Sequence, residues 1–384
     1  MEYLDKAVYI TECDDYNTDN IRVKLNQAFT ALGLNSQYFK DKNVLIKANL
    51  VMAKKPEYAA TTHPAFVRAI ADIVYQYEAA SLTVADSPGG PFNHVTLSSV
   101  YNTCGLNDIA GDRIKLNADF TYSPVRTNGF RLKNFNVINA FLKADIVIDL
   151  CKLKTHALTG MTCSIKNLFG IIPGVEKVEM HSNFTTKEDF SEMLVDLAEY
   201  AVSTKPIIAI CDAVLSHEGN GPTHGIPKKT GLILMSKSLF SLDVVAEHIM
   251  KMDGEVLFLN YAAERGLTKR NYEDIDIIGM DSVPTFDFVR SDASKSMIIK
   301  YPKLLGGRIA KLLETRPKIN RKKCIGCGKC ASSCPKHTIV IKKNKQKRIA
   351  KINPKNCIKC YCCQELCPIG AVDVKQSLIV KILR

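Results

Sequence analysis

The sequence predicts an α/β domain with a mostly parallel, layered sheet, followed by a small cysteine-rich α+β domain. Apolar β-branched runs alternate with helical patterns through the first 300 residues, and several runs are apolar throughout, as expected for strands covered on both faces. Eight of the 14 cysteines then fall into two regular runs near the C-terminus. We expect an α/β domain, a basic amphipathic linker, the cysteine-rich domain and a tail at residues 1–300, 301–320, 321–375 and 376–384.

The expected strands and helices follow one another along the first domain. Short apolar runs predict strands that begin near residues 7, 43, 81, 144, 206, 230 and 275. Apolar residues at helical spacing predict helices over about 19–33, 64–79, 94–104, 186–202, 242–252 and 255–266. Function in open α/β sheets collects beyond the C-terminal ends of the strands, so polar residues at those ends are the candidates for a site.

Two of these strand ends carry modest signals. Lys47 leaves the second strand, and His63 stands before Pro64, where a helix N-cap and a ligand role both remain open. Asp86 and Ser87 end the third strand and enter the loop VADSPGGPFNH. That loop is either a plain turn or an anion-binding loop, although it lacks the Lys and the spacing of a P-loop.

A third strand end, in DLCKLKTHALTGMTCSIKNLFGIIPG, is the most informative stretch outside the cysteine runs. Three of its basic side chains alternate along a buried strand and should point to one face, and two more polar residues follow on a helix expected to begin near Thr159. Buried basic groups need an anion, a metal or internal ion pairs to balance them. An anion site and an internal salt-bridge network therefore both remain open for Lys152, Lys154, His156, Lys166 and Asn167.

The fourth strand end, CDAVLSHEGNGPTHG, combines histidine and carboxylate around glycines. Such groups bind divalent metals or act as acid and base, and a tight turn explains the glycines equally well. We expect catalytic roles for Lys154, His156, Lys166, His217 and Glu218. We expect cofactor-binding roles for Lys47, Asp86, Ser87, Lys152 and Asn167.

The two cysteine runs each read C-x2-C-x2-C-x3-C-P, the spacing that holds 4Fe–4S clusters in bacterial ferredoxins. A zinc site needs only four sulfurs, so eight at this spacing favour two clusters. Cys362 fits no ligand position and is expected to be a packed thiol. The fourth cysteine of each run serves the other cluster in this pattern, so the predicted sets are Cys324, Cys327, Cys330 and Cys367 for cluster one, and Cys357, Cys360, Cys363 and Cys334 for cluster two.

Cysteine usage and the N-terminal residues bear on the compartment. Fourteen cysteines at ferredoxin spacing predict a reducing cytosol, because exposed thiols and clusters survive poorly where disulfides form. The N-terminus is acidic where a signal peptide is basic, and no apolar run approaches the roughly 18 to 20 residues that span a bilayer. We therefore expect a cytoplasmic protein without a transmembrane segment, from an organism that tolerates little oxygen.

Positive charge is concentrated with the cysteines. Residues 301–384 carry 21 Lys and Arg against Glu314, Glu365 and Asp373, a net charge of +18, whereas residues 1–300 have a net charge of −5. This surface is either solvated or a docking site for an acidic redox partner. Nucleic acid is disfavoured, because aromatic residues are not interleaved with the lysines and no known binding motif lies beside them.

Two family resemblances follow from these motifs. The cysteine-rich region resembles the bacterial two-cluster ferredoxin domain, which implies one-electron transfer at low potential; its insert between the runs is expected to be a lengthened hairpin. The segment KTHALTGMTCSIKNLFGIIPG and the VADSPGG and HEGNGP loops make residues 5–290 resemble the domain of unknown function family number 362, a resemblance that implies no activity. About twenty residues ending at Gly174 are also similar to the nickel-dependent lactate racemase family, without its histidine-rich pattern.

Two classes of function remain. In the first, the protein is an oxidoreductase that passes electrons from two 4Fe–4S clusters to a small anionic substrate or cofactor in the α/β domain. In the second, it is an electron carrier or assembly protein whose α/β domain binds a partner without catalysis. The enzyme predicts a closed polar pocket near a cluster. A further metal or a flavin remains possible as an additional cofactor, whereas the absence of G-x-G-x-x-G disfavours nicotinamide and FAD.

Overall fold

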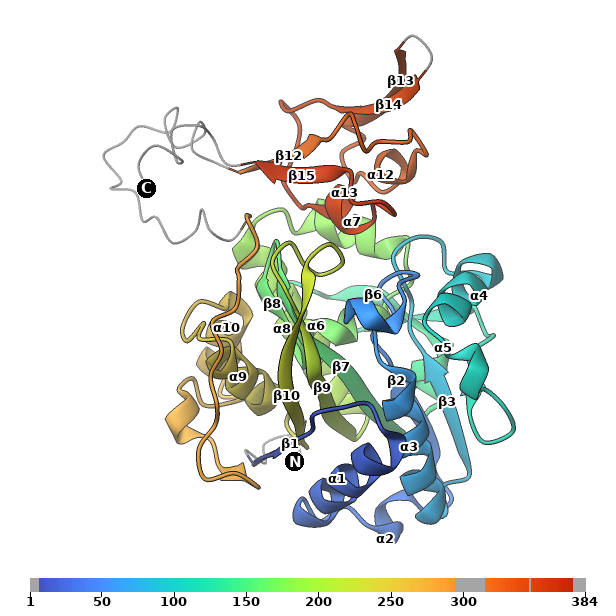
Figure 1. Cartoon of the computed structure of the whole chain (residues 1–384), viewed down its shortest axis with the longest axis vertical. Coiled ribbons are helices and arrows are strands. Elements are labelled where there is room, and N and C mark those ends of the chain that lie inside the picture. The colour runs from blue at the N-terminus through green and yellow to red at the C-terminus, as the bar shows by residue number, and fades with distance from the viewer. Residues whose placement is uncertain (1–6, 294–314, 345–346, 376–384) are drawn as a thin grey trace.

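The computed structural model describes residues 7–293, 315–344 and 347–375. Figure 1 shows the cysteine-rich module (residues 315–375, orange to red) stacked on one end of the α/β domain (residues 7–293), next to helix α7 (Glu176–Asn183). The predicted α/β class with a small α+β module is confirmed. Of the predicted linker at residues 301–320, residues 301–314 lie outside the described residues, as does the tail 376–384, and Arg316–Ile319 form strand β12 of the cysteine-rich module.

Nine strands of the described residues form one sheet, in which the order along the main path is β11-β1-β10-β9-β7-β2-β3-β4 and β8 pairs with β7. The β9-β7-β2-β3-β4 part is parallel, and β10 is antiparallel to both of its neighbours. The carboxyl ends of the parallel strands therefore share one edge. The strands are β1 (Val8–Glu12), β2 (Asn43–Lys47), β3 (Ser81–Ala85), β4 (Lys115–Leu116), β7 (Ile146–His156), β8 (Gly160–Thr162), β9 (Ile207–Glu218), β10 (Ile226–Ser236) and β11 (Ile277–Ile278).

Helices cover both faces of this sheet. On β7, Ile148 and Leu150 enter one core and Val147 and Leu153 enter the other, which explains why this strand is apolar on both sides. One face carries α1 (Thr18–Ala31), α2 (Ser36–Phe39), α3 (Pro64–Gln76) and α4 (His94–Thr103). The other face carries α5 (Asn139–Lys143), α6 (Ser164–Asn167), α7, α8 (Lys187–Thr204), α9 (Leu239–Ile249) and α10 (Leu257–Glu264), and a separate hairpin is formed by β5 (Tyr122–Arg126) and β6 (Asn134–Ile138).

The cysteine-rich module consists of two short antiparallel pairs and two single-turn helices. The expected lengthened hairpin between the cysteine runs is present as β13 and β14. Its elements are β12 (Arg316–Ile319), which pairs with β15 (Val372–Lys375), β13 (Ile339–Asn344), β14 (Lys347–Ile352), α12 (Lys329–Ser332) and α13 (Cys362–Glu365).

Three local expectations can be compared with the structure. The helix expected to begin near Thr159 is wrong, because the chain turns at Gly160 (φ +79°), pairs back on β7 as β8, and becomes helical only at Ser164. The strand expected near residue 275 is only the two residues of β11. His63 is an N-cap, since its Nδ1 accepts a hydrogen bond from Ala65 N at 3.2 Å.

None of the helices in the described part of the chain is both long enough and apolar enough to cross a lipid bilayer.

Candidate active site

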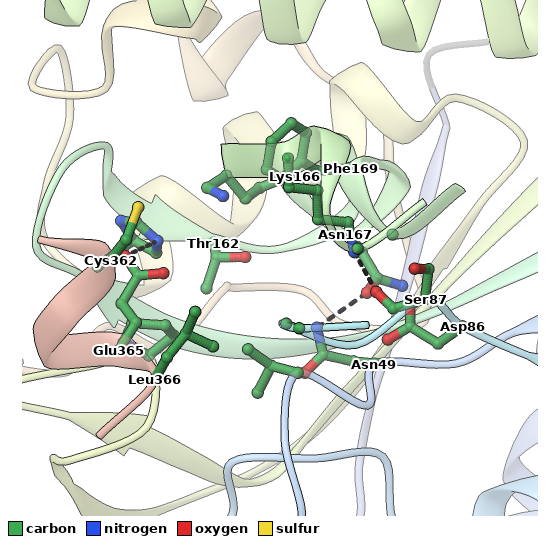
Figure 2. Close-up of a pocket in the computed structure, with 18 of the residues that line it drawn as sticks. Asn49, Asp86, Ser87, Thr162, Lys166, Asn167, Phe169, Cys362, Glu365 and Leu366 are labelled. Atoms are coloured by element: carbon green, nitrogen blue, oxygen red, sulfur yellow. Dashed lines mark hydrogen bonds and ion pairs between the residues drawn. The ribbon is translucent and has the colours of Figure 1, made fainter. Parts of the chain in front are cut away.

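A cavity of about 100 Å³, which we call the charged cavity, lies between the carboxyl ends of the parallel strands and helix α13 of the cysteine-rich module. Figure 2 shows Cys362, Glu365 and Leu366 of the module on one side and Asn49, Asp86 and Ser87 of the α/β domain on the other. Six of the ten residues predicted to have catalytic or cofactor-binding roles line it, namely Asp86, Ser87, Lys154, His156, Lys166 and Asn167.

A buried ion pair positions Asp86 in the lining of the charged cavity. Lys47 Nζ lies 2.9 Å from Asp86 Oδ1, and both side chains are almost fully buried. The other carboxylate oxygen of Asp86 accepts a hydrogen bond from Leu50 N at 2.6 Å. The charge of Lys47 is therefore neutralised by Asp86, and Lys47 does not line the cavity. Asp86 and Ser87 do line it.

A chain of amide side chains positions Lys154. Asn167 accepts a hydrogen bond from Asn49 Nδ2 at 2.8 Å and donates one to Asp149 Oδ1 at 2.7 Å. Lys154 Nζ in turn donates to Asn49 Oδ1 at 2.6 Å and to Ala60 O at 2.9 Å. Burial lowers the pKa of Lys154 to about 7. Its ammonium is thus held in place by two hydrogen bonds, and a nearby anion would stabilise its protonated form.

Lys166 is attracted by the Glu365 carboxylate but makes no direct ion-pair contact in the described part of the chain. It stands on α6 beside the cavity, with its ammonium 4.7 Å from the centre of the Phe169 ring. Among the described residues it has no hydrogen-bond or ion-pair partner, and burial lowers its pKa. A cation taken out of water without a partner is costly, so an anion bound in the cavity would stabilise it.

His156 is held in one tautomer by the β7–β8 turn. Its Nδ1 accepts hydrogen bonds from Leu158 N at 3.1 Å and Thr159 N at 3.3 Å, so in the neutral ring the proton is on Nε2. Burial lowers the pKa of His156, which keeps the ring neutral. Nε2 lies 3.2 Å from Glu365 Oε1, at the contact between the two domains.

Four polar atoms in the wall are buried without a hydrogen-bond partner in the described part of the chain. Two are the carboxylate oxygens Asp86 Oδ1 and Glu365 Oε1, which lie close to Lys47 and His156, and the other two are Ser87 Oγ and His181 Nδ1. All four residues line the charged cavity, and Lys177, which donates to Ser87 O, lines it too. Burial lowers the pKa of Lys177 to about 7. Buried polar atoms without partners indicate a missing ligand or water.

Lys152 belongs to an internal network, away from the cavity lining. Its Nζ lies 2.8 Å from Asp212 Oδ2 and 2.8 Å from the Tyr16 hydroxyl, and that hydroxyl donates to Asp212 Oδ1 at 2.9 Å. The ring of Tyr16 also stacks on His63 at 3.7 Å between centroids. Lys152 therefore fits the alternative of an internal salt-bridge network. Its neighbours Lys154 and His156 line the cavity, as the alternative of an anion site requires.

His217 and Glu218 are engaged in structural hydrogen bonds outside the cavity lining. His217 Nδ1 donates to Tyr58 O at 3.0 Å, and its Nε2 accepts from Gly225 N at 2.9 Å. Glu218 accepts from Val289 N at 2.9 Å and lies 3.2 Å from Lys228 Nζ. Neither ring nitrogen of His217 is left for a metal.

Sequence reasoning missed several lining residues. Lys177 and His181 lie on α7, a charged helix that carries no motif, and Glu365 comes from the cysteine-rich module. The one available signal was Cys362, a cysteine outside the ligand spacing. It was expected to be a packed thiol, and the structure places it, buried, in the cavity wall.

Two small cavities in the cysteine-rich module coincide with the two predicted ligand sets. Backbone N–H groups lie near sulfur atoms of both sets, as in Ala371 N to Cys367 Sγ at 3.1 Å and Thr338 N to Cys334 Sγ at 3.3 Å. The donor atoms therefore fit iron–sulfur clusters. One cavity is lined by Cys324, Cys327, Cys330 and Cys367, and the other by Cys334, Cys357, Cys360 and Cys363.

Gly170 should be irreplaceable for packing reasons. A Cβ atom at this position would lie 1.9 Å from Asp86 Oδ1 and 2.5 Å from Lys47 Nζ. Gly170→Ala is therefore expected to separate the buried ion pair and to lower the free energy of unfolding by about 3 to 5 kcal/mol. The matched control is Gly111→Ala, where a Cβ would meet nothing within 4 Å. Equal denaturation midpoints for the two variants would contradict this packing.

Anion binding should weaken as pH rises through neutrality. Lys154 and Lys177, with pKa values of about 7, are protonated below pH 7 and become neutral above it. Each lysine that must be protonated reduces affinity by about tenfold per pH unit above its pKa. Calorimetric titration with sulfate, whose charge is constant in this range, measures the effect. Constant affinity from pH 6 to pH 8.5 would exclude both lysines from the binding site.

Comparisons with known proteins match both parts of the chain. The family model described as Domain of unknown function (DUF362) matches residues 44–248, and the model described as 4Fe-4S dicluster domain matches residues 323–371. The thylakoid-associated protein sll1697 of Synechocystis sp. is 31% identical over 263 residues, which are 68% of this chain and 79% of that protein. These matches confirm the predicted joining of the two families, and the chain carries two 4Fe–4S clusters.

Solved structures give weaker similarities. A protein from Thermotoga maritima aligns with a TM-score of 0.40 and 12% identity over 62% of this chain. The lactate racemase apoprotein from Thermoanaerobacterium thermosaccharolyticum aligns with a TM-score of 0.41 and 13% identity over 66% of this chain. The chain spans 60% and 58% of the lengths of these two proteins.

Proposed function

Since the chain belongs to the DUF362 family, whose description names no activity, and has a role in iron–sulfur electron transfer, we propose that it is an oxidoreductase acting on a small anionic substrate or cofactor in the charged cavity. The two clusters supply single electrons at low potential. The observation that carries this proposal is the position of the cavity. Cys362, between the predicted ligands Cys360 and Cys363, lines the same space as the unpaired cation Lys166.

The residues of the charged cavity divide the work of binding and proton transfer. Lys154, Lys166 and Lys177 bind the negative charge, and the Ser87 hydroxyl and His181 Nδ1 complete its hydrogen bonds. His156 presents its Nε2–H toward the module, where it is the residue we assign to hold or move a proton. Asn49 and Asn167 position Lys154, and the contact of α13 with the α/β domain excludes bulk water.

The enzyme is favoured over a carrier by the amount of charge enclosed. A carrier whose α/β domain only recognises a partner does not need a desolvated lysine without an ion-pair contact beside Cys362, the neighbour of the predicted ligand Cys363. The carrier nevertheless remains the second candidate, because Cys327 is exposed and cluster one can exchange electrons at the surface.

Native mass spectrometry of the anaerobically purified protein tests the proposal. The expected mass is that of the chain, two clusters and an additional anionic molecule, with that molecule missing from Lys166→Met. Returned to the dithionite-reduced protein, the same molecule should reoxidise the clusters, which their visible absorption reports. If Lys166→Met keeps the additional molecule, that molecule binds outside the charged cavity. If the molecule leaves the reduced clusters unoxidised, binding without turnover is favoured.

The basic surface of the module supports a proposed acidic electron-donor protein. A groove of about 570 Å³ beside Cys357 is lined by six cationic side chains, and it shares the lining residues Ile319 and Ala350 with the cavity that we assign to cluster one. Charge at such a site steers association. The cationic residues are Arg316, Lys318, Arg321, Lys342, Lys343 and Lys351.

Reversing two of these charges should slow reduction by such a donor. Lys318 and Lys351 are exposed, so Lys318→Glu with Lys351→Glu leaves the fold intact. We expect the second-order rate constant with an acidic one-electron donor protein to fall by about tenfold at low salt and to change little at high salt. Stopped-flow absorbance measures it, with Lys115→Glu on β4 as the control. A rate that is equally slowed in the control would show a general charge effect only.

A further inference from the structure

A second and larger space opens beside the charged cavity. It has a volume of about 900 Å³ and lies between α4, α7 and the part of the module around Cys334 and Pro335. The two spaces share four lining residues, Gly89, Gly90, Val178 and Leu366. In the layout of Figure 1, α7 lies directly beneath the module, so this space opens at the seam between the domains. We call it the apolar groove.

The lining of the apolar groove differs in kind from that of the charged cavity. Its walls include Met52, Val95, Val175 and Leu366, and only Glu179 and Lys329 among its lining residues carry a full charge. Val95 is 77% exposed and Val175 is 57% exposed. Large apolar side chains left in water on two helices that border one groove indicate a surface that a ligand covers.

The junction between the two spaces is narrow and closely packed. A Cβ at Gly89 would lie 2.1 Å from Leu366 Cδ2, and a Cβ at Gly174 would lie 2.0 Å from Gly90 O. The loop of Gly89 and Gly90 therefore contacts both Gly174, just before α7, and Leu366 of the module where the two spaces adjoin. A molecule that occupies both spaces must pass these contacts, with Cys362 in the lining of the charged cavity and the predicted cluster-two ligand Cys334 in that of the groove.

We propose that the molecule bound in the charged cavity is amphipathic: an acidic head, carboxylate or phosphate, bound by the lysines, and a hydrocarbon body that lies in the apolar groove. This inference rests on the proposed function and adds the chemical class of the substrate. The excess of positive charge in its lining assigns the acidic head to the charged cavity. The carboxylates among the lining residues are Glu365 and Asp86, which is already paired with Lys47, and they face Lys154, Lys166 and Lys177. The four shared lining residues place the groove directly beside the charged cavity, which assigns the body to the groove.

Affinity should consequently grow with the length of the hydrocarbon. Each buried CH2 group contributes about 0.8 kcal/mol, which is about a fourfold gain in affinity. Inorganic phosphate, butyl phosphate, hexyl phosphate and octyl phosphate form a series with one head and increasing apolar length. Isothermal titration of the anaerobic protein with both clusters present should show the dissociation constant falling by about fourfold for each added CH2 until the groove is filled.

One pair of variants locates the hydrocarbon. Val95→Asp places a charge in the groove at a position that is exposed, so the fold is retained, and it should flatten the dependence on chain length while leaving inorganic phosphate binding unchanged. Val23→Asp is the matched control, because Val23 is also exposed, at 51%, but lies on α1, outside the groove lining. This control should behave as the unaltered protein.

The possible results separate this inference from the proposed function. If all four probes bind equally and Lys166→Met abolishes their binding, the anion site stands and the apolar body is wrong. If chain-length dependence persists in Val95→Asp, the hydrocarbon lies elsewhere and the inference is overturned. If none of the probes binds, the anion site fails, and the proposed function fails with it.

Discussion

Replacing Cys363 by serine is expected to remove cluster two, so that iron falls from about eight to about four atoms per chain, and to stop electron delivery to the charged cavity. Cys363 lines the cavity that we assign to cluster two, together with Cys334, Cys357 and Cys360. A serine hydroxyl is a poor substitute for thiolate in such a site. Iron analysis and electron paramagnetic resonance of the reduced protein measure the loss, and circular dichroism should show the α/β domain still folded.

Two neighbouring variants make this prediction specific. Cys362→Ser changes the adjacent thiol, which lines the charged cavity and is no predicted ligand, and it should retain all the iron. Cys327→Ser should lose the other cluster, with the α/β domain intact. If Cys362→Ser loses iron while Cys363→Ser retains it, the ligand assignment is wrong by one position and the wall of the charged cavity is itself part of a cluster site.

Local pattern accounts for the parts of this structure that were predictable. Strands that are buried on both faces, such as β7, are recognisable in the sequence as apolar runs. The proline after His63 likewise marks the start of α3. Cysteine spacing is equally local, because the loops between ligands have fixed lengths. These features depend only on residues close to one another in the chain, and the structure has them where the pattern places them.

The charged cavity depends on contacts that no local pattern contains. Cys362 and Lys166 are nearly 200 residues apart in the sequence and meet only because the module docks on the carboxyl ends of the strands. Alternation along β7 correctly grouped Lys152 with Lys154, but it does not show depth. Lys152 lies lower on the strand, where Asp212 and Tyr16 balance it, and only the sheet register of β7 with β9 reveals that partner.

Lys166→Met is expected to weaken phosphate and sulfate binding by about two orders of magnitude, the effect of about 3 kcal/mol lost with a desolvated charge contact. The same change should leave the free energy of unfolding unaltered or raise it. In the free protein Lys166 has no ion-pair contact among the described residues, and its desolvation outweighs the longer-range attraction of Glu365, so methionine removes a net cost and keeps the packing against Phe169. Calorimetric titration and urea unfolding measure the two quantities on one sample.

Lys152→Met is the counterpart on the same face of the site, and it should reverse both results. Its ammonium is fully paired, so its loss leaves Asp212 as a buried carboxylate without its cation and should cost about 3 kcal/mol or more of stability. Anion affinity should persist, because Lys152 does not line the charged cavity. Opposite changes in anion affinity and in stability therefore distinguish Lys166, a cation proposed to bind a ligand, from Lys152, a cation with a structural ion pair. Lower stability with intact binding in Lys166→Met would make it a structural residue and remove the central support for an anion site.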